Sequence, residues 1–139
     1  KGIDVLYNAI EILQTQSKDI SFLIVGRADN NIQQSYLDQI QKLDRTYVFS
    51  EYIPNNEVGN YFECSDLVVL PYISATQSGI AKIAFSFNKT VITTKVGGLQ
   101  EIDKEGDAIL INPESIVEIS DAVINYFNNQ LLNYKYLFN

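Results

Sequence analysis

The chain has 139 residues, of which 46% are apolar and 19% are charged, as expected for one globular domain that is long enough to bury a sizeable core. Its formal net charge of −7 argues against nucleic-acid binding through a basic face, because such binding needs clustered Lys and Arg. Histidine is absent, which removes the commonest metal ligand and the commonest general base and argues against a zinc enzyme or a Ser-His-Asp hydrolase.

Other features of the composition concern where the protein resides. The chain has no apolar run long enough for a membrane span and no secretory leader, so we expect a cytoplasmic protein without a membrane segment. The single cysteine, Cys64, rules out an internal disulfide and is expected to be a core residue. Because the chain begins at Lys1 and contains no methionine, we also expect it to be an excerpt of a longer polypeptide.

Apolar residues at helical spacing alternate along the chain with short, continuous apolar runs. The helical spacing predicts a helix start at residues 54–57 and helices over residues 3–13, 32–43, 80–87, 98–103 and 115–128. The apolar runs predict strands at residues 20–25, 47–49, 67–70, 90–94 and 108–111. Helices that alternate with strands across short connections predict an α/β fold, in which a doubly wound parallel sheet has helices on both faces.

The predicted domain covers residues 1–129 and leaves a tail at residues 130–139. The tail is rich in apolar and aromatic side chains, namely Leu131, Leu132, Tyr134, Tyr136, Leu137 and Phe138. This composition is too apolar for a free terminus. We therefore expect the tail to dock on a missing domain or on a partner.

In a doubly wound fold, ligands bind outside the carboxyl ends of the strands. The strand at residues 67–70 is followed by the polar turn Thr76, Gln77, Ser78 and Gly79, and then by a helix. A helix start presents amide groups without partners and the positive end of the helix dipole, so this turn favours phosphate. The same residue types are also explained if Thr76 or Ser78 is only the N-cap of the helix.

Two other predicted strands end in glycine at the same edge of the sheet. The strand at residues 90–94 runs into Gly97 and Gly98, which let a backbone approach a ligand closely or form an ordinary turn. The first predicted strand ends at Gly26 and Arg27, and the sequence leaves both a ligand-facing and a solvent-facing Arg27 open. Together these loops predict one shared crevice.

Further residues near this edge have two interpretations each. Tyr52 and Ile53 contact a base through ring and backbone, or they pack a simple turn. Lys82 lies one helical turn beyond Ser78, where it approaches phosphate or ribose or is solvated. Glu101 reaches the ligand or caps a short helix.

Nearly the whole chain carries short motifs in a recognisable order. They are Lys1-Gly2 with Leu6, and residues 22–26, 49–54, 61–71 with Asp66, 89–92 and 96–101. In order and spacing, these motifs resemble the nucleotide-sugar-binding half of the group 1, or family 4, glycosyltransferases. Members of that family are two-domain enzymes of the GT-B fold.

The resemblance implies the donor-binding domain of a retaining, metal-independent enzyme without a cofactor. Such an enzyme transfers a sugar from a nucleotide-diphosphate sugar to a glycan or lipid-linked acceptor, here in polysaccharide biosynthesis. The resemblance further implies that Lys1 neutralises the donor diphosphate and that the departing phosphate acts as the base. A missing N-terminal domain is expected to bind the acceptor.

The chain departs from the family pattern at two positions. The resemblance implies one glutamate on each side of the Gly-rich turn, but these places hold Ala75 and Ile83. A second hypothesis is therefore a catalytically inactive GT-B-like module that binds a nucleotide or a partner. A third, an unrelated flavodoxin-like or receiver domain, is disfavoured because the first strand lacks the acidic cluster of a phosphoacceptor pocket.

Overall fold

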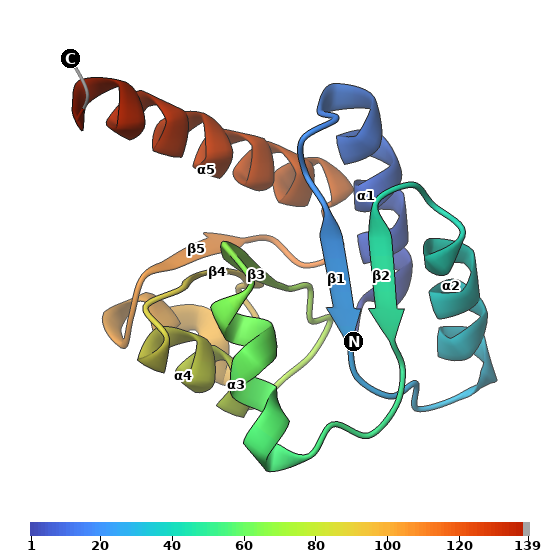
Figure 1. Ribbon diagram of the computed structural model, residues 1–139. Helices are drawn as coiled ribbons and strands as arrows, with labels where there is room; N and C mark the ends of the chain where they lie inside the picture. Colours follow the sequence, from blue (N-terminus) through green and yellow to red (C-terminus); the bar gives the residue numbers. More distant parts are fainter. Residues whose placement is uncertain (138–139) are drawn as a thin grey trace.

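The computed structural model describes the backbone of residues 1–137 and the side chains of residues 1–130. Over this range, helices alternate with strands as predicted (Figure 1). In chain order the elements are α1 (Ile3–Gln16), β1 (Phe22–Val25), α2 (Asn31–Gln41), β2 (Thr46–Phe49), α3 (Asn55–Glu63), β3 (Leu67–Leu70), α4 (Gly79–Ser86), β4 (Thr90–Thr94), the 3-10 helix η1 (Gly97–Lys104), β5 (Ala108–Ile111) and α5 (Ile116–Leu137).

All pairings between the strands are parallel, and the strands fall into two sheets. One sheet joins β1 to β2, with Phe22 opposite Thr46, and the other places β4 between β3 and β5. The predicted class, parallel strands flanked by helices, is confirmed. The structure differs from one continuous sheet in that β1 and β3 are not hydrogen-bonded to each other within the described residues.

The core lies on both faces of the sheet that contains β4. Ile92 packs on one face in a cluster with residues of α1 and α5, and Val91 packs on the other face with residues of α4 and η1. Successive strand residues point to opposite faces, so neighbouring β4 residues join different clusters. This arrangement confirms that helices cover both faces.

Buried threonines of β4 fix the carboxyl end of β3. The Thr93 hydroxyl donates to the carbonyl oxygen of Leu70 at 3.1 Å, and the Thr94 hydroxyl donates to that of Tyr72 at 2.7 Å. Thr93 and Thr94 are almost fully buried, so their hydroxyls need such partners. The chain leaving β3 is therefore held against β4 at the edge where the sequence predicts a ligand site.

Two local predictions are wrong. Cys64 is exposed at the end of α3 rather than buried in the core. The last helix does not end near residue 128 but continues to Leu137, since the segment holds no glycine or proline to stop it. The predicted docking of the tail concerns side chains from residue 131 onward, which lie outside the described ones. None of the described helices combines the length and apolar character that a bilayer crossing requires.

Candidate functional site

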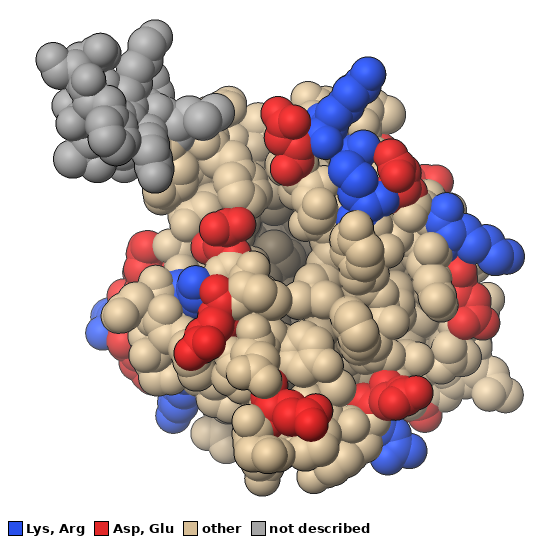
Figure 2. Space-filling model, viewed as in Figure 1, with Lys and Arg blue, Asp and Glu red and all other residues tan. Residues whose placement is uncertain are grey.

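A cleft of about 530 Å³ runs between β1 and β3 and reaches the carboxyl ends of both strands. Among its lining residues are four that the sequence predicts for the site: Lys1, Gly26, Arg27 and Ile53. Figure 2 shows a hollow in the surface between the part of the molecule built on β1 and the part built on β3, β4 and β5. The structure thus brings together residues that lie far apart in the sequence.

Lys1 reaches across this edge to the loop that follows β1. Its Nζ atom lies 3.0 Å from a carboxylate oxygen of Asp29 and 3.4 Å from the carbonyl oxygen of Arg27. The hydrogen bond from Lys1 holds the pKa of the Asp29 carboxyl below its usual range. Both side chains are more than half exposed, so the pair contributes little to stability and the ammonium can exchange Asp29 for another anion at small cost.

Gly2 holds Lys1 at the cleft through a close backbone contact. Gly2 is buried, and a Cβ atom placed on it would lie 1.8 Å from the carbonyl oxygen of Pro71. The start of α1 therefore packs directly on the chain that leaves β3. Lys1 is thus held from two directions, by Asp29 and by the contact between Gly2 and Pro71. The sequence analysis did not single out Asp29.

Helix α4 borders the cleft on the β3 side through Ile80 and Ile83, whereas Ser78 and Gly79 at its start are not among the lining residues. Ser78 is buried, and its hydroxyl accepts a hydrogen bond from the Ala81 amide at 3.1 Å, which is the N-cap interpretation of this residue. The Tyr72 hydroxyl lies 3.3 Å from the Ser78 hydroxyl. Gly79 begins the helix, and no atom lies within 4 Å of a Cβ placed on it, so the space beside the helix start is open.

The glycine pair after β4 has a packing role. Cβ atoms placed on Gly97 and Gly98 would lie 2.0 Å and 1.9 Å from the carbonyl oxygens of Ala75 and Thr76. Only glycine permits this approach, and Gly97 also has a positive φ of 48°. The pair thus positions the turn between β3 and α4. A close approach of a ligand to these glycines stays a prediction.

The other predicted residues do not line the cleft. Tyr52, Thr76, Gln77 and Lys82 are exposed on the surface. Glu101 forms a surface ion pair with Lys104 at 3.1 Å. Their contacts with a ligand therefore stay predictions.

Apolar side chains stand where the resemblance implies a carboxylate. Ile83 is 38% exposed and lines the cleft, and its neighbour Ile80 on α4 is 48% exposed and does the same. Ala75 is half-buried. Ile80 and Tyr72 also line the cleft, although the sequence analysis did not assign them to the site. Their sequence signal was position, because Ile80 directly follows the predicted turn and Tyr72 lies just beyond the end of the strand at residues 67–70.

The fold and this edge define a class of protein. Parallel strands flanked by helices end here at a cleft bordered by a lysine, an arginine and the start of a helix, which is the layout of α/β domains that bind phosphorylated ligands. The chain matches the family described as Glycosyl transferases group 1 over residues 1–129, and it belongs to that family.

Curated relatives carry glycosyltransferase names. The chain is 29% identical over 131 residues to TuaC of Bacillus subtilis (strain 168), a glycosyltransferase whose name assigns it to teichuronic acid biosynthesis. It is 24% identical over 124 residues to the 2-deoxystreptamine glucosyltransferase of Streptomyces kanamyceticus. These matches cover 94% and 88% of the chain but only 31% and 32% of the relatives, so the chain spans about a third of their length.

Solved structures support the fold. The C-terminal domain of a glycosyl transferase group 1 family protein, LpcC, from Francisella tularensis superposes with a TM-score of 0.79 at 24% identity, covering 97% of this chain and 73% of that one. An alpha,alpha-trehalose-phosphate synthase (UDP-forming) from Burkholderia xenovorans, in complex with glucose-6-phosphate, superposes with a TM-score of 0.72 at 19% identity. This match covers 89% of this chain and 32% of the synthase. The chain thus has the fold of a group 1 C-terminal domain.

Proposed function

We propose that this chain is the donor-binding domain of a glycosyltransferase that takes a sugar from a nucleotide-diphosphate sugar. The observation that carries the proposal is the convergence of Lys1, Arg27 and the start of α4 on one cleft at the carboxyl ends of β1 and β3. Membership of the group 1 family supports the reaction type. The structurally similar trehalose-phosphate synthase from Burkholderia xenovorans is named as UDP-forming, and this name supports a nucleoside diphosphate as the leaving group.

The chemistry of sugar transfer fits the charges at this edge. When the bond between sugar and diphosphate breaks, negative charge grows on the leaving phosphate. Lys1 supplies a positive charge there, because its weak exposed pairing with Asp29 yields to a stronger anion. The first turn of α4 adds amide groups and the positive end of a helix dipole beside open space.

Retention of configuration and independence of a metal belong to the same proposal. The chain has no histidine to act as a base, and a departing phosphate that accepts the acceptor proton removes that need. The anomeric configuration of the product, read by NMR, tests retention. Removal of divalent cations with EDTA tests metal independence, and we expect activity to survive it. Loss of activity after this treatment would contradict metal independence.

The acceptor is proposed to be a glycan or a lipid-linked acceptor, bound in the cytoplasm by an N-terminal domain of the longer protein. The name of TuaC, which assigns it to teichuronic acid biosynthesis, supports this acceptor. This chain covers only about a third of the length of TuaC, which supports a further domain.

Calorimetric titration of the full-length protein with UDP, GDP, UDP-glucose and GDP-mannose tests the donor site. We expect one nucleotide to bind, and Lys1→Ala to weaken its binding by about 10-fold to 100-fold, as for one charge-assisted hydrogen bond. Lys104→Ala is the matched control, because Lys104 is also an exposed lysine in a surface ion pair. Absence of binding at millimolar ligand, or equal effects of the two variants, would overturn the proposal.

A second candidate function is an inactive module that binds a nucleotide or a partner protein. It is favoured by Ala75 and Ile83, which leave the turn without the two carboxylates that the resemblance implies. Detection of sugar transfer or of donor hydrolysis by the full-length protein excludes this candidate. Nucleotide binding without either reaction supports it.

A further inference from the structure

Helix α4 presents an apolar face to the cleft. Ile80 and Ile83 stand at i and i+3, so they share one side of the helix, and both line the cleft. The residues that α4 buries in the core are different ones, Ala81 and Ala84. A surface helix normally has one apolar stripe, which faces the core. The exposed isoleucines therefore form a second apolar surface, and it faces the candidate site.

The surroundings of this surface offer few partners to a polar ligand group. Val58 and Phe62 of α3 line the same cleft and extend the apolar wall. The Tyr72 hydroxyl, which also lines it, already lies 3.3 Å from the Ser78 hydroxyl. Within the part of the chain that the structure describes, no aspartate, glutamate or asparagine lines this cleft. A ligand hydroxyl placed against α4 would therefore lose water without gaining a carboxylate as acceptor.

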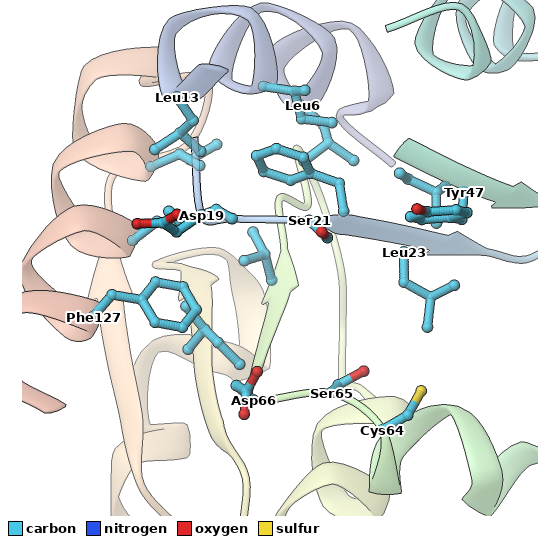
Figure 3. A pocket seen from close by; sticks show the side chains of 18 residues that line it. Leu6, Leu13, Asp19, Ser21, Leu23, Tyr47, Cys64, Ser65, Asp66 and Phe127 are labelled. Carbon is cyan, nitrogen blue, oxygen red and sulfur yellow. The ribbon is translucent and has the colours of Figure 1, made fainter. Parts of the chain in front are cut away.

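A second cavity, of about 360 Å³, has the opposite character. Two carboxylates line it, those of Asp19 and Asp66 (Figure 3). Asp19 precedes β1 and Asp66 precedes β3, so both stand at the amino-terminal ends of the strands. A strand of four residues spans about 13 Å, which separates these carboxylates from the edge where Lys1 and α4 begin. A phosphorylated ligand at that edge meets the isoleucines first.

The direction of α4 indicates which part of a ligand meets this surface. Because α4 connects two parallel strands, it starts at their carboxyl ends and runs back toward their amino ends. A helix rises 1.5 Å per residue, so Ile83 lies about 6 Å along the axis from Gly79. With a diphosphate at the helix start, the transferred sugar has to face the acceptor outside this edge. The ribose on the other side of the diphosphate then lies along α4.

We propose that the site takes a 2′-deoxyribonucleoside diphosphate sugar, whose deoxyribose packs on Ile80 and Ile83. This inference rests on the proposed function and names the class of its donor. A 2′-hydroxyl buried against these side chains gives up its hydration without a partner, which weakens binding. The methylene group of a deoxyribose is instead stabilised by the same contact. Doubly wound folds that hold a ribose 2′-hydroxyl do so with an acidic residue.

Calorimetric titration of the full-length protein with matched nucleotides tests this donor class. The pairs are UDP with 2′-deoxy-UDP and GDP with 2′-deoxy-GDP, which differ only in the 2′-hydroxyl. For the base that binds, we expect the deoxy form to bind about 10-fold more tightly, as for one hydroxyl buried without a partner. Equal binding, or tighter binding of the ribonucleotide, would overturn the inference and leave the proposed function standing. Absence of all binding would overturn both, so the two failures are distinguishable.

A carboxylate added to the wall locates the ribose. We expect Ile83→Glu to shift the ratio of the two dissociation constants by about 10-fold toward the ribonucleotide, because the glutamate accepts a hydrogen bond from a ribose hydroxyl. The ratio is measured because repulsion between the new carboxylate and the phosphates weakens both ligands alike. Both positions that are changed are exposed, so the fold accommodates a glutamate at each.

Val117→Glu is the matched control. Val117 is likewise a β-branched apolar residue exposed on a helix, at 64%, and it is not among the residues that line the cleft. This variant is expected to leave the ratio unchanged. If Ile83→Glu also leaves the ratio unchanged, the ribose does not lie along α4 and the inference is wrong.

Discussion

The half of the domain built on β3, β4 and β5 is buried more deeply than the half built on β1 and β2. All five residues of β4 are buried, whereas Val25, Tyr47 and Phe49 in the smaller sheet are 39%, 58% and 44% exposed. The turn between β3 and α4 belongs to the first half and is held by backbone contacts, while Arg27 and Asp29 belong to the second and are held by exposed polar ones. One wall of the cleft is thus fixed by packing and the other by contacts that exchange easily.

Truncation of one isoleucine in each half gives the largest expected contrast. Ile92 is fully buried in β4, so Ile92→Ala is expected to lower the free energy of unfolding by about 4 kcal/mol. Ile24 in β1 is half-buried beside a cavity, and Ile24→Ala is expected to cost only about 1 kcal/mol. Equilibrium unfolding in urea measures both losses. Equal losses would contradict the contrast between the halves.

The glycine pair gives the second largest effect. Gly97→Ala places a Cβ atom against the Ala75 carbonyl at a positive φ, and we expect a loss of about 3 kcal/mol in the free energy of unfolding. Gly79→Ala is the matched control, because the space around that position is open. Its effect is expected to stay within about 0.5 kcal/mol. Similar thermal midpoints for the two variants would show that the turn moves aside freely.

The cap of α4 predicts a smaller loss. Ser78→Ala removes the hydroxyl that accepts the Ala81 amide hydrogen bond and is expected to cost about 1 kcal/mol of stability. Ser86→Ala, at the other end of the helix, removes an exposed hydroxyl bonded to the Ile83 carbonyl and serves as the control. Urea unfolding compares the two variants. A larger loss for Ser86→Ala would refute the capping role of Ser78.

The contact between Lys1 and Asp29 predicts the smallest effect, which depends on pH. Because Lys1 lowers the pKa of the folded-state Asp29 carboxyl, the contact stabilises the fold at neutral pH and is lost as the pH falls through that lowered pKa. Lys1→Met is expected to raise the pKa of the Asp29 carboxyl toward the ordinary range of aspartate, because the hydrogen bond from Lys1 is the main cause of its lowering. A carboxyl-detected NMR titration measures this change. An unchanged pKa would show that the pair does not form in solution.

The sequence predicted the elements well because their patterns are local. Continuous apolar runs such as residues 67–70 and 90–94 identify strands, and helical spacing at residues 3–13 identifies α1. The place of the candidate site was predicted from the rule that ligands bind outside the carboxyl ends of parallel strands. Lys1 and Arg27 both line the cleft at that edge of the sheet. No local pattern states which strands become neighbours, so the gap between β1 and β3 was not foreseen.

The roles of single residues were harder to predict, because they depend on distant backbone. Gly97 and Gly98 look alike in the sequence whether a ligand or the Ala75 carbonyl lies above them. Asp29 is one of many acidic residues until the fold brings it to Lys1. Ser78 had two interpretations from the start, and only the geometry of the helix start shows the cap.

The packing of α1 on α5 has a consequence for synthesis of the protein. The two helices share one core cluster, with Leu13 and Ile119 among its members, although α1 ends at Gln16 and α5 begins at Ile116. A ribosome needs on the order of ten seconds to make the chain between them. During that interval the apolar face of α1 has no final partner, so the nascent chain presents it to chaperones and to other nascent chains until α5 emerges.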